Sequence, residues 1–327
     1  MSEKILEIKD ERLSFFTPAG EVKALNGVSF SMNQGDVLGI VGESGSGKSV
    51  TAYSIMGLTA YPGRLVGGTV WFNGHQIDKM TEKEFRKIRG NEVSIIFQDP
   101  MTSLNPVYTI GNQIVEVILL HTKKTKQEAW ARARELLELV GINEPDRRLK
   151  QYPHELSGGM RQRVVIAIAI ANDPDLLICD EPTTALDVTV QLQVLRLLKL
   201  KARASGTAVL FISHDMAVVS QLCDRLYVMY AGSVIESGPT QTVIQRPTHP
   251  YSIGLLKCAP EHGEPRALLP AIPGTVPNLT CLPAGCAFRE RCFAAGPRCE
   301  ETPALSSQGG VDQQSACWYP QLETTHV

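Results

Sequence analysis

A glycine-rich segment near the N-terminus has the spacing G-x-x-x-x-G-K-[ST]. Glycines let the backbone curl so that successive N–H groups face one anion, and a helix beginning near Lys48 would point its positive end at the same anion. Lys48 is suited to contact the β- and γ-phosphates of ATP, and Ser49 to ligate Mg²⁺. A chance Gly/Ser turn is the alternative, which the apolar strand pattern before the segment disfavours. The predicted phosphate loop comprises Gly42, Glu43, Ser44, Gly45, Ser46, Gly47, Lys48 and Ser49.

Two carboxylates follow the apolar segment LLIC in the sequence LLICDEP. Asp180 is placed to hold Mg²⁺, directly or through water, and Glu181 to polarise the water that attacks the γ-phosphate. Taken alone, an Asp-Glu pair of this kind is also common as the acidic cap of a helix. The presence of the phosphate loop on the same chain therefore favours the catalytic interpretation of the pair.

A second anion-binding helix start is predicted within LSGGMRQR, where Ser157, Gly158 and Gly159 precede a helical pattern. An ordinary Ser-Gly-Gly helix cap is the alternative. These residues resemble the signature of the ABC ATPases. That resemblance implies that this segment binds the γ-phosphate of the nucleotide held by an opposite subunit, so the working unit is a dimer of ATPase domains.

Three shorter motifs resemble the same family in order and spacing. The family implies that Gln98 of IFQDP senses Mg²⁺ and the membrane partner, that the loop ending at Asp187 contacts the other subunit, and that His214 of ISHD contacts the γ-phosphate. We expect Phe15 to stack on adenine, with Phe16 as the alternative. Either residue could instead belong to the hydrophobic core. Glu181 and His214 are thus the predicted catalytic residues, and Ser49, Gln98 and Asp180 the predicted Mg²⁺ group.

The elements that must position these residues are indicated by apolar runs. VLGIV, LLIC, AVLFI and LYVMY read as buried strands with helical stretches between several of them, which predicts a largely parallel sheet in an α/β domain. In residues 127–141, Trp130, Ala133, Leu137 and Val140 recur at helical spacing, and Gly141 is placed to end the helix. We therefore expect a helical insert at about 101–160.

Bulk composition limits the classes of function. The 327 residues carry a formal net charge of -2 without a long basic run, so neither nucleic acid nor a bare anionic membrane is supported as a direct partner. The N-terminus is charged from its third residue and does not read as a signal peptide, and the longest apolar run, VVIAIAIA, is too short to span a bilayer. Eight cysteines without a secretory signal indicate a reducing compartment.

The composition shifts after Gln245, because eleven of the twenty prolines and six of the eight cysteines lie beyond it. Long regular elements are improbable there. Four of the cysteines in this region have the spacing C-x5-C-x6-C-x17-C. Four thiolates could hold zinc or an iron–sulfur cluster. Zinc ribbons favour C-x2-C pairs, which are absent, and unligated cysteines are the third alternative. The four are Cys286, Cys292, Cys299 and Cys317, and Cys281 lies outside the pattern.

The resemblance narrows further with QDPMTSLNP, THPYSIGLL and the cysteine-rich tail, which are similar to the ATPase subunits of bacterial dipeptide and oligopeptide importers. Residues 188–238 look especially like the D,D-dipeptide member. This family implies a second ATPase subunit, as homo- or heterodimer, two membrane permeases, a periplasmic peptide-binding protein, and a peripheral position on the cytoplasmic face of the inner membrane. In some members the tail holds a [4Fe-4S] cluster, which makes that the favoured ligand here.

The predicted architecture is therefore an ABC-type P-loop ATPase domain at 1–245, with an irregular Cys- and Pro-rich region at 246–327. Two other classes compete. A soluble ABC protein of DNA repair or of the ribosome would carry a long coiled coil or two cassettes, and the chain has neither. An exporter ATPase is disfavoured because exporters commonly fuse the membrane domain to the cassette.

Overall fold

The computed structural model describes residues 4–183, 187–258, 271–307 and 312–322. The chain forms two compact units. The first comprises residues 1–5, 32–37 and 79–211, and the second comprises residues 6–31, 38–78 and 212–327.

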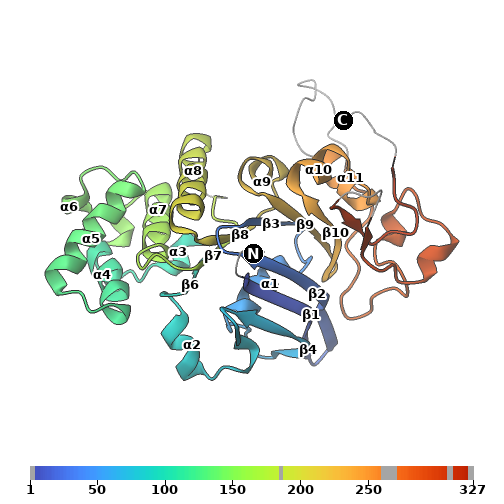
Figure 1. Cartoon of the computed structure of the whole chain (residues 1–327), viewed down its shortest axis with the longest axis horizontal. Coiled ribbons are helices and arrows are strands. Elements are labelled where there is room, and N and C mark those ends of the chain that lie inside the picture. The colour runs from blue at the N-terminus through green and yellow to red at the C-terminus, as the bar shows by residue number, and fades with distance from the viewer. Residues whose placement is uncertain (1–3, 184–186, 259–270, 308–311, 323–327) are drawn as a thin grey trace. The chain divides into compact units, whose positions relative to one another are not determined.

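The first unit combines short parallel strands with a group of helices. Strands β6 and β7 pair in parallel, with Val93 opposite Leu176 and Ile96 opposite Cys179. Helices α4, α5 and α7 pack against one another, as the green part of Figure 1 shows. The unit contains α2 (Glu82–Ile88), β6 (Val93–Ile96), α3 (Pro100–Ser103), α4 (Ile110–His121), α5 (Lys126–Leu139), α6 (Pro145–Arg148), η2 (Pro153–Glu155), α7 (Gly158–Ala169), β7 (Leu176–Asp180), α8 (Val188–Ser205) and β8 (Ala208–Ile212).

Local chemistry explains why α5 forms where the spacing predicts it. Its first turn is closed by a capping box, in which the Thr125 N–H donates to Glu128 and the Thr125 hydroxyl accepts from the Glu128 N–H. Its buried face includes Ala133 and Leu137, as predicted. Gly141 follows the helix with a φ of 74°, a left-handed conformation that suits glycine. The structure places α3 to α6 in the helical stretch expected at about 101–160, and the extent of that stretch as a subdomain stays a prediction.

The second unit contains an antiparallel sheet and the strand that leads into the phosphate loop. The sheet has the order β2-β1-β4-β5, seen in blue in Figure 1. β3 has all five residues buried and pairs in parallel with β9, as expected for the run VLGIV. The elements are β1 (Lys4–Thr17), β2 (Gly20–Asn33), β3 (Val37–Val41), α1 (Lys48–Ile55), β4 (Gly63–Phe72), β5 (His75–Gln76), η1 (Ile77–Lys79), α9 (Met216–Leu222), β9 (Arg225–Tyr230), β10 (Ser233–Pro239) and α10 (Thr240–Gln245).

Among the described residues after Gln245 there is one α-helix, which the composition did not predict. α11 (Pro250–Lys257) begins with proline in its first turn, and the Nδ1 atom of His249 accepts the Tyr251 N–H at 3.0 Å. Burial of Tyr251 and Ile253 then fixes the helix on the unit. The other described elements are short: η3 (Arg289–Arg291), η4 (Pro297–Glu300), β11 (Ser306–Ser307) and β12 (Gln314–Ser315).

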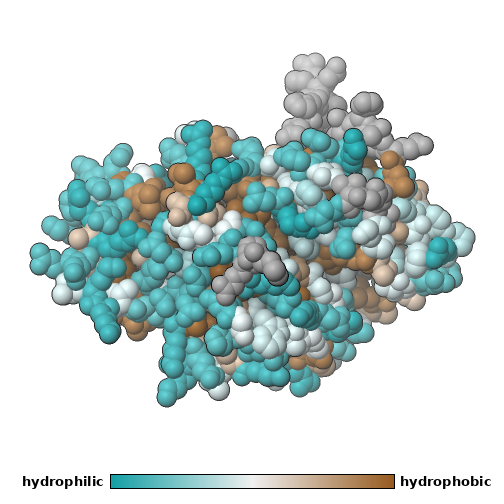
Figure 2. Space-filling model, in the orientation of Figure 1, coloured by the Kyte–Doolittle hydropathy of each residue, from teal (hydrophilic) through white to brown (hydrophobic). Residues whose placement is uncertain are grey.

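The drawn face of the molecule is mostly hydrophilic. Hydrophilic side chains cover most of the face drawn in Figure 2, and apolar side chains appear between them in small groups. Among the described residues, no helix is both long and apolar enough to cross a membrane.

Candidate nucleotide site

The phosphate loop of the second unit requires glycine at two positions. A Cβ atom at Gly42 would lie 2.2 Å from the carbonyl oxygen of Met229, at a φ of 153°. Gly47 is the N-cap of α1 with a φ of 103°, and a Cβ there would lie 2.9 Å from the Ala24 carbonyl oxygen. Any side chain at these positions would displace backbone, so the glycine spacing of the motif has a direct steric cause.

Lys48 begins α1 and is 6% exposed. Its Nζ donates to the carbonyl oxygens of Gly42 at 2.7 Å and Glu43 at 2.9 Å. The loop therefore curls around the ammonium group, and Ser49 follows in the first turn of the helix. The helix start predicted near Lys48 is confirmed, with its positive dipole end at the loop.

The first unit places Gln98 and Glu181 together. The Gln98 Nε2 donates to Glu181 Oε2 at 3.1 Å, and Asp180 is fully buried as the last residue of β7. Glu181 has a φ of 49°, a left-handed conformation that is costly for a residue with a side chain and that often marks a functional site. The neighbouring turn is held by Gln162 of α7, whose Nε2 donates to the Pro182 carbonyl oxygen at 2.7 Å. Sequence reasoning missed Gln162, because only the fold brings it to this turn.

The signature segment has the geometry of a helix start that can receive a ligand. Ser157 is the N-cap of α7, and its hydroxyl accepts the Met160 N–H at 3.3 Å. The helix begins at Gly158, so Gly158 and Gly159 are its first two residues rather than its lead-in. Ser157 and Gly158 are exposed, and a Cβ atom at Gly158 would meet nothing within 4 Å. This open helix start suits an anion presented from outside the chain.

The remaining predicted residues are placed individually. Asp187 is exposed and caps α8 by accepting the Val190 N–H at 2.9 Å, while Ala185 and Leu186 lie outside the described residues. His214 is exposed two residues after β8 ends.

The two candidates for adenine stacking lie near the end of β1, as expected. Phe15 is partly buried, and a Cβ atom at Gly63 would lie 2.6 Å from its ring. Phe16 is 38% exposed, with the Arg64 guanidinium carbon 4.0 Å from its ring centre. Each ring already has a neighbour, so the assignment of Phe15 to adenine stays a prediction.

The four patterned cysteines influence one another electrostatically. Burial raises the pKa of Cys317 to about 11, and the thiols of Cys292, Cys286 and Cys299 add to that increase. The Tyr319 N–H donates to Cys317 Sγ at 3.4 Å. Within the described ranges, however, no group of three or more His, Cys, Asp or Glu side chains is placed to hold a single metal ion.

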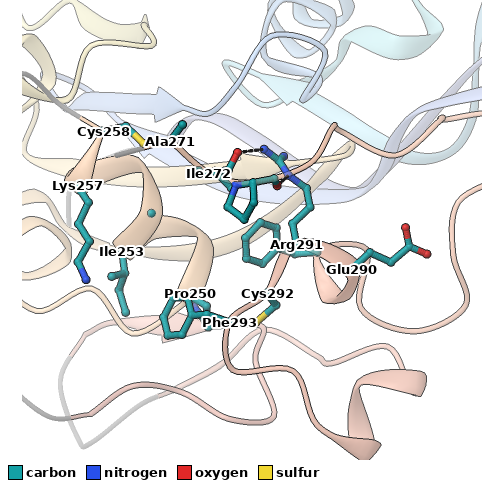
Figure 3. A pocket seen from close by; sticks show the side chains of 13 residues that line it. Pro250, Ile253, Lys257, Cys258, Ala271, Ile272, Glu290, Arg291, Cys292 and Phe293 are labelled. Carbon is teal, nitrogen blue, oxygen red and sulfur yellow. Dashed lines mark hydrogen bonds between the residues drawn. The ribbon is translucent and has the colours of Figure 1, made fainter. Parts of the chain in front are cut away.

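A pocket of about 360 Å³ lies beside this cysteine region (Figure 3). It is lined by α11 residues such as Ile253 and by Cys258, Ile272, Arg291 and Cys292. Arg291 is a second residue that sequence reasoning missed, because no motif indicates its buried position.

Comparison with known families decides how these motifs belong together. Residues 25–184 match the ABC transporter family model, and residues 235–299 match the C-terminal region of oligopeptide/dipeptide transporters. The probable D,D-dipeptide transport ATP-binding protein DdpD of Escherichia coli (strain K12) is 60% identical over 100% of both chains. The chain belongs to the ATPase subunits of the ABC transporter family. The predicted family is therefore confirmed.

Other relatives agree with this assignment. The oligopeptide transport ATP-binding protein OppD of Escherichia coli (strain K12) is 49% identical over 93% of this chain and 90% of its own. A solved dimeric ATP-binding cassette in a post-hydrolysis state, bound to ADP and Pi, aligns with a TM-score of 0.67 and 27% identity. It covers 72% of this ABC subunit and 99% of the cassette. The α/β cassette fold is thus confirmed.

Proposed function

We propose that this ABC subunit hydrolyses ATP to power the import of dipeptides or oligopeptides, with D,D-dipeptides as the favoured cargo. The observation that carries the proposal is the end-to-end 60% identity to a D,D-dipeptide transport protein, together with the peptide-transporter C-terminal region at 235–299. A soluble ABC ATPase of DNA repair or of the ribosome is not favoured, because the close relatives are transport proteins.

The proposed chemistry assigns one role to each motif. Lys48 and the loop N–H groups bind the phosphates, Ser49, Gln98 and Asp180 hold Mg²⁺, and Glu181 orients the attacking water. The left-handed backbone of Glu181 and its bond from Gln98 support this role, because both restrict where the carboxylate points.

The further proposed contacts are those of the adenine, the γ-phosphate and a partner cassette. Phe15 stacks on adenine, and His214 contacts the γ-phosphate. Ser157, Gly158 and Asp187 serve the interface with a second cassette, which their exposure supports.

The proposed assembly is a transporter with two ATPase subunits, two membrane permeases and a periplasmic peptide-binding protein. This subunit is peripheral, on the cytoplasmic face of the inner membrane. No nucleic acid takes part, in keeping with the net charge of -2.

The cargo is tested on the assembled complex in proteoliposomes that contain its binding protein. We expect D-alanyl-D-alanine to stimulate ATP hydrolysis and to enter the vesicles, and L-alanyl-L-alanine to do so less. Stimulation by longer L-peptides alone would move the cargo to oligopeptides. A complex that hydrolyses ATP but transports no peptide would refute the import proposal.

We also propose that Cys286, Cys292, Cys299 and Cys317 ligate a [4Fe-4S] cluster. Their mutual effect on pKa values supports proximity, and backbone N–H groups donate to Cys286, Cys292 and Cys317 as they do around cluster sulfurs. The C-x2-C pairs that zinc ribbons favour are absent from the sequence, which favours the cluster over zinc. When bound, the cluster would supply folding energy to a region with few regular elements.

The cluster proposal predicts that anaerobically purified protein is brown and contains iron and acid-labile sulfide in near-equal amounts. Replacing any of the four cysteines with serine should bleach it, whereas Cys281→Ser should not, because Cys281 is exposed and outside the pattern. Colourless protein with stoichiometric zinc, or without metal, would overturn the proposal.

A further inference from the structure

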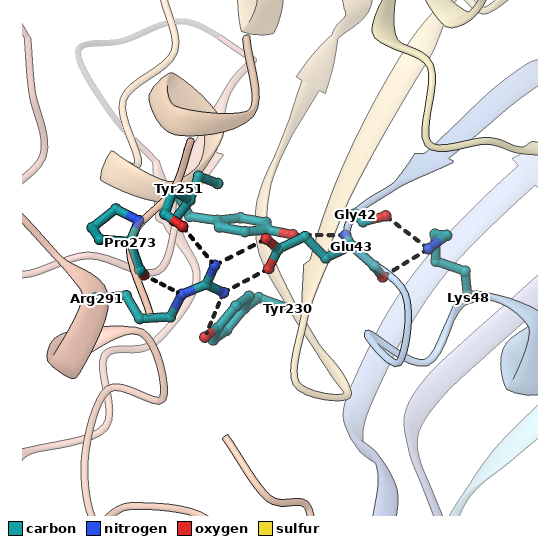
Figure 4. Close-up of polar contacts among 8 residues, drawn as sticks. Gly42, Glu43, Lys48, Tyr230, Tyr251, Pro273 and Arg291 are labelled. Carbon is teal, nitrogen blue, oxygen red and sulfur yellow. Dashed lines mark hydrogen bonds and ion pairs between the residues drawn. The ribbon is translucent and has the colours of Figure 1, made fainter. Parts of the chain in front are cut away.

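The second residue of the phosphate loop is held by two side chains from the C-terminal region of the same unit (Figure 4). The Glu43 N–H donates to the Tyr251 hydroxyl oxygen at 2.8 Å, across 208 positions of sequence. The Glu43 carboxylate accepts two hydrogen bonds from Arg291, at 2.6 and 3.0 Å, across 248 positions. This forked contact is the geometry in which arginine binds a carboxylate most strongly.

Arg291 is fully engaged in this position. Its side chain is 6% exposed, and besides the two bonds to Glu43 it donates to Pro273 O at 2.9 Å, Tyr230 Oη at 3.3 Å and Ile272 O at 3.4 Å. These five bonds match the five N–H donors of a guanidinium. Hydrogen bonding to Glu43 raises the pKa of Arg291 further above its ordinary value, so the group stays charged. The carboxylate is therefore tied to a rigid donor.

Glu43 also contacts the lysine of the phosphate loop. The Glu43 carbonyl oxygen accepts from Lys48 Nζ at 2.9 Å and from the Ser46 N–H at 3.2 Å. Glu43 is thus fixed at its N–H, its carboxylate and its carbonyl oxygen. Lys48 and Ser46, which should face the phosphates, both donate to that carbonyl oxygen. A loop held in its binding conformation before ligand arrives loses less entropy on binding.

We propose that Arg291, assisted by Tyr251, is a positioning residue that sets the phosphate loop for ATP. Neither side chain contacts the phosphates in this scheme, because both act through Glu43. The inference rests on the proposed phosphate-binding role of residues 42–49.

The test compares ATP binding by the purified full-length chain and its variants, with a non-hydrolysable ATP analogue and Mg²⁺ as the probe. We expect Arg291→Ala to weaken binding roughly tenfold, which corresponds to about 1.4 kcal/mol. In the assembled complex KM for ATP should rise by a similar factor, while kcat stays near wild type. Hydrogen exchange of the backbone amides of residues 43–48 should accelerate in the nucleotide-free variant and slow again when the analogue binds.

Three further variants separate positioning from folding of the C-terminal region. Arg298→Ala is the matched control, because that guanidinium lies in the same region and stacks on Trp318, 3.9 Å from its ring centre. Tyr251→Phe removes only the hydroxyl that accepts the Glu43 N–H. If Arg291→Ala fails to fold, Glu43→Gln tests the same contact from the loop side and should raise KM in the same way.

The outcomes are distinct. Wild-type ATP affinity in Arg291→Ala, or in Glu43→Gln and Tyr251→Phe together, would overturn the inference, as would an equal loss in Arg298→Ala. Lys48→Ala reports on the underlying proposal: if it binds ATP normally, the phosphate-loop assignment itself fails. If Lys48→Ala abolishes binding and Arg291→Ala has no effect, only the positioning role is lost.

Discussion

A buried carboxylate on β10 provides the most direct test of how the C-terminal region is held. Glu236 has no exposed surface and accepts four hydrogen bonds, from the Thr248 N–H and hydroxyl, the His249 N–H and the Gln313 amide, at 2.7 to 3.1 Å. Three of these bonds end on one oxygen and the fourth on the other. The substitution Glu236→Gln preserves size but replaces one acceptor oxygen with a donor.

The geometry gives the magnitude. In the variant the amide oxygen can keep the donors from Thr248 and Gln313, but the new NH₂ group then faces the His249 N–H, so two donors oppose each other. Hydrogen bonds to a charged group contribute about 1.5–3 kcal/mol each, and neutral ones about 0.5–1.5 kcal/mol. The weakening of three bonds is largely offset because a neutral amide costs less to bury than a carboxylate, so loss of the fourth bond, with its opposed donors, should dominate and lower the local stability by about 2–4 kcal/mol.

Hydrogen exchange measures this loss at the amides of Thr248, His249 and Ala316, the last of which donates to the Ile235 carbonyl oxygen at 2.8 Å. The estimate corresponds to exchange roughly 30- to 1,000-fold faster than in wild type. Glu300→Gln is the matched control, because Glu300 is exposed in the same region. Wild-type exchange in Glu236→Gln would refute the view that this carboxylate anchors the segment.

Three further predictions concern chemistry, assembly and pH. Glu181→Gln should retain ATP binding while hydrolysis by the assembled complex falls about 10²- to 10⁴-fold, and normal turnover would assign the role elsewhere. Ser157→Arg should leave ATP binding by the isolated chain unchanged and block ATP-driven dimerisation in size-exclusion chromatography; equal loss of both would contradict the exposed helix start. Burial raises the pKa of Glu11 from 4.5 to about 7, so the native state keeps a proton that the unfolded chain releases, and stability should fall as pH rises from 4.5 to 7. The free energy of unfolding should fall by about 3 kcal/mol between pH 4 and pH 8, measured by urea denaturation, and Glu11→Gln should remove this fall. A variant with the same pH profile as wild type would contradict the burial argument.

The parts of the fold that follow from local pattern were predictable. VLGIV and AVLFI became β3 and β8 residue for residue, because short, mostly apolar runs bounded by turn residues favour strands buried on both faces. Gly141 ended α5 as expected, because a left-handed residue after a helix favours glycine.

What escaped prediction depends on contacts between distant segments. α11 was hidden by the prolines around it, and its stability comes from burial of Tyr251 rather than from an apolar repeat. The pairing of Arg291 with Glu43 joins residues 248 positions apart, and neither residue type signals a partner by itself. The same limit applies to Gln162, which reads as an ordinary polar residue of α7 until the fold sets it against Pro182.

The short strand β12 alters what a deletion of the C-terminal region would do. It pairs antiparallel with β10, with Ser315 opposite Glu236 and Gln314 opposite Ser237, and so covers hydrogen-bonding groups along one side of β10. An uncovered strand edge is a template for pairing with other chains. A chain cut after Gln245 would therefore present a bare sheet edge, and we expect it to self-associate through that edge rather than behave as a smaller monomeric ATPase.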